Sequence, residues 1–430
     1  FSIMLVRIIF IGLFFGVIIS VNYLVYRTFR NFLLRSKIKM RTVNLVTRIP
    51  FTAFVLPYII LIFTRFDFTD LPLWVDRFVM IPFFAFQGAV IFTGLYLLAG
   101  KIIKLPFLLF RSIINRVKSL KERYKKFRSH KSVVAFDKSR RNFLTASSAA
   151  VAGYAFIGAG IGAIGKDDFR LEEQSIKLKN LPEEFKGLTA VLISDIHSGP
   201  FMEYGMMRHY VDVINDLNPD MIFIPGDVTN SNRNEAAPFA KAFRDLKAKH
   251  GIFGTMGNHD YFSSADYISD VLRNETPINV LRNDFSRIEI NGKSLIVAGT
   301  EDTRDSGNNS NHILSGYVRD TLKKSEDFLS AEGADPSGVP KLLLAHKPYM
   351  FDEISGMNFD MMFSGHTHGG QIVFLKLADV NVSIASTVNK YISGLYSLNG
   401  KYMYVSRGLG TVGLPLRLNC PPEITKFTLI

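Results

Sequence analysis

Histidine, aspartate and asparagine side chains recur in the second half of the chain, directly after short apolar runs. Two histidines, His366 and His368, lie two positions apart in a glycine-rich segment, residues 365–371. In an extended segment, side chains at positions i and i+2 project to the same side, so two neutral imidazoles can point at one small volume. The flanking glycines allow the backbone to turn tightly beside a ligand. The segment therefore predicts part of a metal site.

The same pattern, an apolar run followed by metal-ligand residue types, occurs at four further places. The residues concerned are Asp195 with His197, Asp227, Asn258 with His259 and Asp260, and His346. In open α/β sheets, ligands bind beyond the carboxyl ends of the strands, so we expect all five loops to converge. Imidazole, carboxylate and amide oxygen together suit divalent ions such as Mn, Fe or Zn.

Taken together, these five motifs resemble the full signature of the calcineurin-like metallophosphoesterases, from about residue 187 onwards. Residues 406–410 and 417–424 resemble the membrane-associated bacterial branch of that family. The resemblance implies an α/β fold in which two sheets pack as a sandwich flanked by helices. It also implies a binuclear metal centre that hydrolyses phosphate esters. Residues 226–230 depart from the family pattern, because no acidic residue follows three places after the aspartate, but the metal ligand is intact.

The resemblance also implies a role for each matching residue. One ion would be held by Asp195, His197, Asp227 and His368, and the other by Asp227, Asn258, His346 and His366. Asp227 would then bridge two ions, which lower the pKa of a shared water and clamp the phosphoryl oxygens. His259 would protonate the leaving oxygen, and Asp260 would orient it.

Two questions stay open at the level of sequence. Three arginines, Arg304, Arg407 and Arg417, could contact substrate phosphate or form structural ion pairs. The chain could also be a non-enzymatic membrane module that keeps the fold as a partner surface. The complete ligand set, with a histidine directly after Asn258, favours an enzyme.

Charge is distributed unequally along the 430 residues. Residues 1–142 contain 24 Lys and Arg against 5 Asp and Glu, whereas residues 143–430 contain 27 against 33. Because the basic excess lies among hydrophobic segments, we expect an anionic membrane face as the partner and not nucleic acid. The single cysteine, Cys420, excludes an intrachain disulfide.

The basic half contains segments long and apolar enough to span a bilayer. We expect three spans at residues 3–25, 49–63 and 78–100, within a membrane region over residues 1–142. Residues 143–165 form a fourth span or an export segment. Arg140 and Arg141, just before it, resemble a twin-arginine export signal, or are simply basic residues at the start of a helix.

Basic residues in the connecting loops predict the topology, because basic loops stay in the cytoplasm. The loops at residues 27–48 and 101–141 carry seven and fourteen basic residues, whereas residues 64–77 carry two. We therefore expect a multi-pass cell-membrane protein with an extracytoplasmic catalytic domain. Its substrate would be a phosphomonoester, phosphodiester or pyrophosphate, either lipid-linked or a nucleotide, and the sequence leaves the oligomeric state open.

The second half alternates apolar runs with amphipathic segments, which is typical of layered α/β structure. We expect a linker over residues 166–186 and a metallophosphoesterase domain over residues 187–430. Helices are expected at residues 206–217, 238–250, 264–273 and 316–330. The Asn399-Gly400 pair between two strand-like runs predicts a hairpin turn. Residues 302–312 are expected to form a loop.

Overall fold

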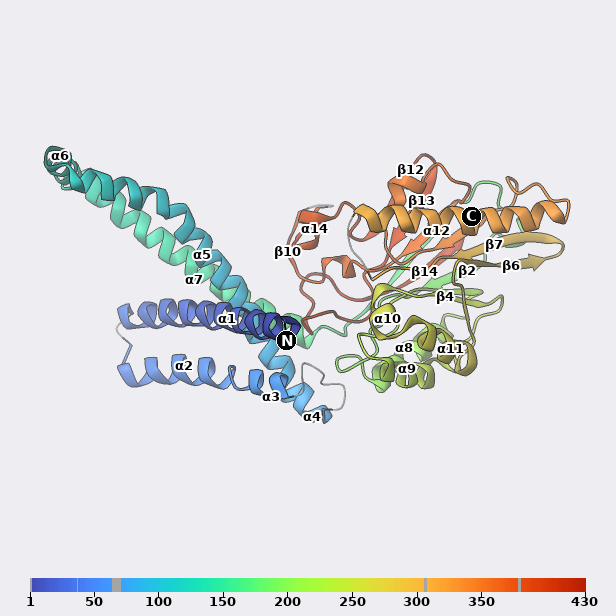
Figure 1. Cartoon of the computed structure of the whole chain (residues 1–430), viewed down its shortest axis with the longest axis horizontal. Coiled ribbons are helices and arrows are strands. Elements are labelled where there is room, and N and C mark those ends of the chain that lie inside the picture. Colours follow the sequence, from blue (N-terminus) through green and yellow to red (C-terminus); the bar gives the residue numbers. More distant parts are fainter. Residues whose placement is uncertain (1, 37, 64–70, 305–307, 378–379) are drawn as a thin grey trace. The chain divides into compact units, whose positions relative to one another are not determined.

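The structure is a computed structural model that describes residues 2–36, 38–63, 71–304, 308–377 and 380–430 (Figure 1). The chain divides into two compact units. The helical unit comprises Phe1–Asp67 and Arg77–Ile161. The second unit comprises Phe68–Asp76 and Gly162–Ile430 and is called the catalytic unit after the catalytic domain that the sequence predicts within it. The loop predicted at residues 64–77 lies partly outside the described residues.

Long apolar helices make up the helical unit. Its helices are α1 (Ser2–Arg35), α2 (Met40–Ala53), α3 (Pro57–Phe63), α5 (Ile81–Arg116), α6 (Lys118–Arg128) and α7 (Lys131–Ile164), with α4 (Leu73–Val75) and the π-helix η1 (Asp76–Met80) before α5. Four segments of the described chain are long and apolar enough to cross a membrane: Gly12–Arg35, Met40–Ile59, Leu73–Arg116 and Lys131–Ile164. The second begins nine residues before the predicted span at residue 49 and therefore includes Arg48, which is exposed.

A buried polar bridge joins three parts of the helical unit. The side-chain amide of Asn22 on α1 donates to Oε1 of Gln87 on α5 at 3.0 Å. Gln87 in turn donates to the carbonyl of Phe54, just after α2, at 2.8 Å. Such a bridge holds apolar helices together, because each buried amide group needs a hydrogen-bond partner.

The catalytic unit contains two six-stranded sheets. The first has the order β1 (Arg170–Ile176), β14 (Glu423–Leu429), β2 (Thr189–Leu192), β3 (Met221–Pro225), β4 (Ile252–Thr255) and β5 (Ile278–Val280). The second has the order β12 (Gly394–Leu398), β13 (Lys401–Val405), β9 (Met361–Ser364), β8 (Lys341–Leu344), β7 (Lys293–Gly299) and β6 (Asp284–Ile290). The strands β2–β5 run parallel, as do β7, β8, β9 and β13. A small third sheet pairs β10 (Val373–Leu377) with β11 (Val380–Ser383).

Successive side chains along each strand point to opposite faces of the sheet, which explains why the two sheets pack against each other. Phe223 and Phe363 project between the two sheets into a shared core. Their neighbours project the opposite way: Ile222 lies in the core under α8 (Tyr204–Asp216), α9 (Ala236–Phe243) and α11 (Ala265–Glu275). Met362 lies in the core under α12 (Asn308–Ala331) and α13 (Phe351–Ile354). Figure 1 shows α8, α9 and α11 on one side of the sandwich and α12 on the other, which confirms the predicted two-sheet fold flanked by helices.

One expectation about the boundary of the domain was wrong. The segment predicted as a linker, residues 166–186, contains β1, which pairs in parallel with β14 at the edge of the first sheet. The residues of β1 are mostly polar, and Ile176 is the one buried residue of this strand. An edge strand needs little apolar sequence, because its side chains remain largely in water.

Local signals predicted several elements correctly. Asn399 and Gly400 adopt φ values of 52° and 76° between β12 and β13, the left-handed pair of a type I′ hairpin. The four predicted helices are present as α8, α9, α11 and α12, although α9 ends at Phe243 instead of residue 250. The predicted loop over residues 302–312 is shorter, because α12 begins at Asn308, and residues 305–307 lie outside the described residues.

Candidate metal centre

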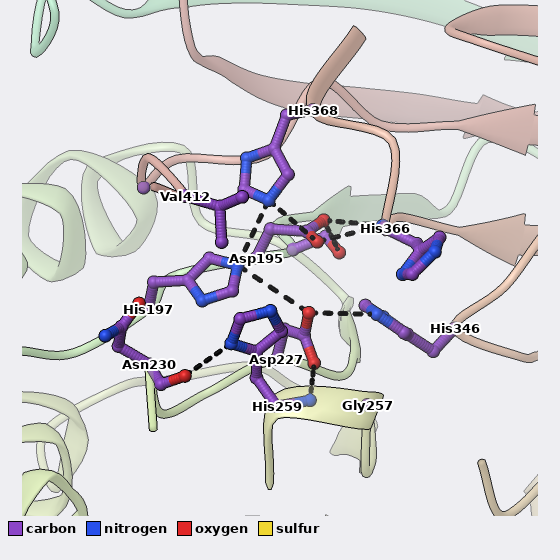
Figure 2. Close-up of polar contacts among 12 residues, drawn as sticks. Asp195, His197, Asp227, Asn230, Gly257, His259, His346, His366, His368 and Val412 are labelled. Carbon is purple, nitrogen blue, oxygen red and sulfur yellow. Dashed lines mark hydrogen bonds and ion pairs between the residues drawn. The ribbon is translucent and has the colours of Figure 1, made fainter. Parts of the chain in front are cut away.

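Five loops meet at one end of the sandwich and carry all the predicted ligand residues (Figure 2). Loops after β2, β3 and β4 come from the first sheet, and loops after β8 and β9 come from the second. These strands lie in the middle of their sheets, so their positions are set by the buried core. The convergence predicted from the five motifs is therefore present in the fold.

Two groups of side chains could each hold a metal ion. The first is Asp195, His197 and His368, and the second is Asp227, His346 and His366. Within each group, one ligand atom from every residue lies within 4.8 Å of the others. Nε2 of His197 lies 3.0 Å from Nε2 of His368.

Asp227 lies between the two groups. Its Oδ2 is 3.6 Å from Nε2 of His197 and 3.1 Å from Nε2 of His346. His197, Asp227 and His259 form a third group whose ligand atoms are equally close. One carboxylate thus contacts histidines of both groups, which is the geometry of a bridging ligand.

Asn258 provides a test of whether a metal fits. Its Oδ1 is buried, and no described residue hydrogen-bonds to it. A buried amide oxygen without a hydrogen-bond partner lowers the stability of the folded protein by about 1–3 kcal/mol. Asn258 begins α10 (Asn258–Ser263), directly after the strand that leads to the site. The unpaired Oδ1 of Asn258 can instead bind a cation, so the residues present fit a divalent ion.

The backbone conformation of the loop that carries His366 and His368 differs from the extended one predicted from sequence. We expected His366 and His368 to share a face of an extended segment. Both instead have left-handed backbone, with φ of 71° and 51°, on either side of Thr367 at φ −86°. The glycines are needed for space: a Cβ on Gly365 would lie 2.2 Å from Oδ2 of Asp195, and one on Gly257 2.2 Å from Oδ1 of Asp227.

Neighbouring backbone groups fix which ring nitrogen faces the site. Nδ1 of His346 lies 2.8 Å from the carbonyl of Pro225, so this nitrogen carries the proton and Nε2 points at Asp227. The carbonyl of Gly410 similarly accepts a hydrogen bond from the His368 ring. Asp195 accepts from Oγ of Ser194 at 2.6 Å and from the amide of His366 at 2.8 Å. Such outer contacts orient the ligands before an ion binds.

The protonation states of the buried side chains favour a cation. Burial lowers the pKa of His197 and His366 well below the usual value, and lowers the pKa of His368 to about 3. These imidazoles are neutral near pH 7, the form that binds metal. Burial alone would raise the pKa of Asp227, but His346 and His197 lower it well below its usual range. His346 is different: burial opposes its protonation, yet the charge of Asp227 raises its pKa to about 10, so a cation that binds this ring would have to displace a proton.

His259 lies beside the predicted ligands, but its ring contacts a different group from the one expected. The ring is partly exposed, and its Nδ1 contacts the carbonyl of Asn230. Asp260 was expected to orient this ring. Its carboxylate instead accepts hydrogen bonds from the amides of Gly257, Val228 and Thr229 at 2.9, 3.3 and 2.9 Å. Asp260 therefore holds the loop after β3 against the loop after β4, and affects His259 only through the backbone.

Comparisons with known proteins agree with this geometry. The sequence pattern of the calcineurin-like phosphoesterases matches residues 188–370. The uncharacterized metallophosphoesterase YkuE of Bacillus subtilis is 30% identical over 302 residues, which cover 68% of this chain and 97% of that protein. The chain belongs to the calcineurin-like phosphoesterase family.

Other members of the family match this chain over a smaller share of their own length. A zebrafish transmembrane protein with metallophosphoesterase domain is 30% identical over 60% of this chain. An uncharacterized metallophosphoesterase of Helicobacter pylori is 29% identical over 61% of it. The chain spans 57% of the zebrafish protein and 64% of the Helicobacter protein. Family membership and the buried His/Asp clusters together are typical of a binuclear-metal phosphoesterase site.

The structure resolves the roles of two arginines that the phosphoesterase motifs left open. Arg407 forms ion pairs with Glu172 at 2.6 Å and Glu423 at 2.7 Å, so it is structural. Arg417 is buried and donates to the carbonyls of Arg407 and Gly410 at 2.8 and 2.5 Å. Because the Gly410 carbonyl also contacts the His368 ring, Arg417 stabilises the surroundings of this candidate ligand. This contact could not be predicted from sequence, because it links a side chain to a backbone carbonyl in a loop.

A tyrosine that sequence reasoning missed borders the site. The ring of Tyr349 lies 5.4 Å from that of His366, nearly perpendicular to it, and burial raises its pKa to about 12. Tyr349 follows His346 by three positions. That spacing is the only sequence signal that could have identified it.

Proposed function

We propose that the protein is a membrane-anchored, binuclear-metal phosphoesterase that hydrolyses phosphomonoester, phosphodiester or pyrophosphate bonds. The observation that carries this proposal is the position of Asp227, whose Oδ2 contacts one histidine of each ligand group. A structural zinc site would need only one closed group of four ligands. Two groups that share a carboxylate suit a pair of ions that clamps the attacking and leaving oxygens of an in-line phosphoryl transfer.

The assignment of ligands follows the two groups. One ion would be held by Asp195, His197, Asp227 and His368, and the other by Asp227, Asn258, His346 and His366. When bound, the two ions would supply a nucleophilic water at neutral pH and neutralise charge on the phosphate. Carboxylate, amide and imidazole ligands are compatible with Mn, Fe or Zn.

His259 is the residue we assign to proton transfer. It is partly exposed, whereas its neighbours His197 and Asp227 are buried, so it lies at the open side of the site. The Asn230 carbonyl accepts from Nδ1, which leaves Nε2 free to face the substrate. A protonated ring in this position can donate to the leaving oxygen.

The membrane part of the proposal rests on composition and likeness. Four segments can cross a bilayer, and the zebrafish relative is named as a transmembrane protein. We propose a membrane region over residues 1–142, a fourth span over residues 143–165 and a catalytic domain beyond it, as in the membrane-associated bacterial branch. The basic residues of the loops support an extracytoplasmic catalytic domain. The Arg140-Arg141 pair would then act in export.

Metal analysis and hydrolysis assays on the purified full chain test the proposal. We expect about two transition-metal ions per chain and hydrolysis of aryl phosphates, both lost with a chelator and restored by manganese. His209, which is exposed on α8, provides a matched control, because His209→Ala removes an imidazole outside the site. Metal binding without hydrolysis of any aryl monoester, diester or pyrophosphate would support a non-enzymatic module instead.

A further inference from the structure

Large apolar side chains are exposed next to the metal centre. Leu375 on β10, Val382 on β11, Ile384 at the start of α14 (Ala385–Val388) and Val388 at its end are 50%, 39%, 69% and 75% exposed. We call these four residues the hairpin surface. They fall within fourteen residues of sequence, whereas other exposed apolar side chains of the catalytic unit, such as Phe262 and Ile313, are dispersed along the chain. Concentrated exposure of this kind marks an interaction surface.

The hairpin surface packs against the loop that carries His368. Ser383 and Ser386 exchange hydrogen bonds at 2.9 and 3.1 Å, which fix the turn between β11 and α14. Ile384 and Val388 are four positions apart and so lie on one face of this turn. A Cβ on Gly370 would lie 2.5 Å from Oγ of Ser383, so the loop that carries His368 packs directly on the hairpin.

The same hairpin is linked to the end of a candidate membrane span. The last turn of α7 belongs to the catalytic unit, and there the carbonyl of Gly162 accepts from the amide of Arg417 at 2.9 Å. The next residue in that segment, Leu418, accepts from the amide of Val373 at the start of β10, also at 2.9 Å. A side chain at position 162 would meet the carbonyl of Arg417 at 2.7 Å, so this approach is close. Residues 417 and 418 therefore connect the end of the span to the hairpin through one hydrogen bond each.

We infer that the hairpin surface docks in the interface of the bilayer that α7 crosses, and that the metal centre acts on phosphate esters of membrane lipids. A span that ends at Ile164 leaves the hydrocarbon there, so groups bonded to its last turn lie at the level of the headgroups. Apolar side chains at this level can enter the acyl boundary by roughly 5–10 Å. The phosphate of a lipid lies at the same depth. The substrate class rests on the proposed function, whereas the docking of the surface does not.

Fluorescence quenching by lipids tests the docking. Trp74 is the single tryptophan, so Val388→Trp in a Trp74→Phe background reports on one position. The full chain is reconstituted in vesicles of phosphatidylcholine and phosphatidylglycerol that carry doxyl groups near the headgroup end of the acyl chains. We expect roughly half of the emission to be quenched if the side chain lies in the interface. Tyr267→Trp in the same background is the matched control, because Tyr267 is exposed on α11, and it should remain unquenched.

Kinetics test the substrate class. In the same vesicles, hydrolysis of a soluble aryl phosphate is compared with that of phosphatidic acid, phosphatidylglycerol and a nucleoside diphosphate diacylglycerol. We expect at least one lipid to be cleaved, and Ile384→Asp/Val388→Asp to lower the ratio of lipid to soluble rates by about tenfold or more, since two charges oppose insertion. The double control Tyr267→Asp/Ile313→Asp should leave this ratio unchanged.

Each outcome decides one part. An unquenched Val388→Trp overturns the docking, as does an emission shift that depends on protein concentration, which would mean that a second copy covers the surface. Cleavage of the aryl phosphate with no cleavage of any lipid, or an unaltered ratio in the aspartate pair, overturns the lipid substrate. Loss of all hydrolysis, aryl included, refutes the proposed function instead, and the quenching result still stands.

Discussion

Replacement of His259 by alanine should separate chemistry from metal binding. The backbone amide of His259 donates to Oδ1 of Asp227 at 2.8 Å, and alanine keeps this hydrogen bond. The substitution removes the ring, its contact with the Asn230 carbonyl, and its packing against the rings of Phe262 and His197, whose centroids are 5.2 and 4.6 Å away. Of these residues only His197 is a proposed ligand, and its Nε2 keeps its contacts with Asp227 and His368. Metal content should therefore stay near that of the unaltered protein.

Turnover should fall by roughly 10²–10⁴, the usual contribution of a positioned acid or base, which corresponds to about 3–5 kcal/mol in the activation barrier. The loss should depend on the leaving group. An acidic phenol departs without a proton and should lose little, whereas a poor leaving group should lose the full amount. The assay is kcat for a series of aryl phosphates, measured beside metal analysis of the same samples.

Two results would refute the role assigned to His259. An equal loss for good and poor leaving groups would mean that no proton reaches the leaving oxygen from this ring. A parallel loss of metal would mean that His259 is itself a ligand, as its place in the group with His197 and Asp227 would permit. His209→Ala should change neither quantity, which controls for the loss of an imidazole as such.

Three further predictions concern the metals, the stability of the site and the topology. Asp227→Asn should lower metal content and activity together, because a neutral amide cannot bridge two cations; elemental analysis and aryl phosphate hydrolysis measure both. Lys347→Met should destabilise the catalytic unit by about 3–5 kcal/mol, because the buried carboxylate of Asp302, 2.7 Å from Nζ of Lys347, would lose its countercharge. The apparent Tm should fall, and a second substitution, Asp302→Asn, should restore part of the loss. A reporter that is active only outside the cytoplasm should be active when fused after Lys166 and also between the second and third spans; silence after Lys166 would place the catalytic domain inside.

The positions of the ligand residues could be predicted from sequence because they depend on the ends of central strands. Each of these strands is a short buried run, and burial is the signal that sequence carries most clearly. Once β3 and β8 are aligned in their sheets, Asp227 and His346 are brought together by topology alone. The hairpin turn at Asn399-Gly400 was predictable for a different reason, since only a few residue types adopt two successive left-handed conformations.

The features that sequence could not supply depend on atoms of the backbone. β1 was missed because an edge strand has no apolar alternation to detect. Asp260 was assigned to the wrong partner because adjacency in sequence suggested the His259 ring, whereas its carboxylate binds the amides of the loop after β3. Arg417 donates to the backbone carbonyl of Gly410, and every residue has such a carbonyl, so the residue types do not indicate this contact. Contacts of this kind appear only when the fold is known.

The conformation of the ligands themselves links the glycine-rich motifs to the metal. Five of the seven proposed ligands, Asp195, His197, Asp227, His366 and His368, have φ values between 49° and 71°. A residue other than glycine in this region costs of order 1–3 kcal/mol and persists only where its surroundings impose it. Here they do: hydrogen bonds hold each loop, and the neighbouring glycines let the loops approach one another. Because asparagine, aspartate and histidine tolerate this region better than most residues, the residue types that bind metal are also those that can form the loops. Backbone strain and metal ligation therefore select the same amino acids, which explains why so short a set of motifs specifies both the shape of the site and its chemistry.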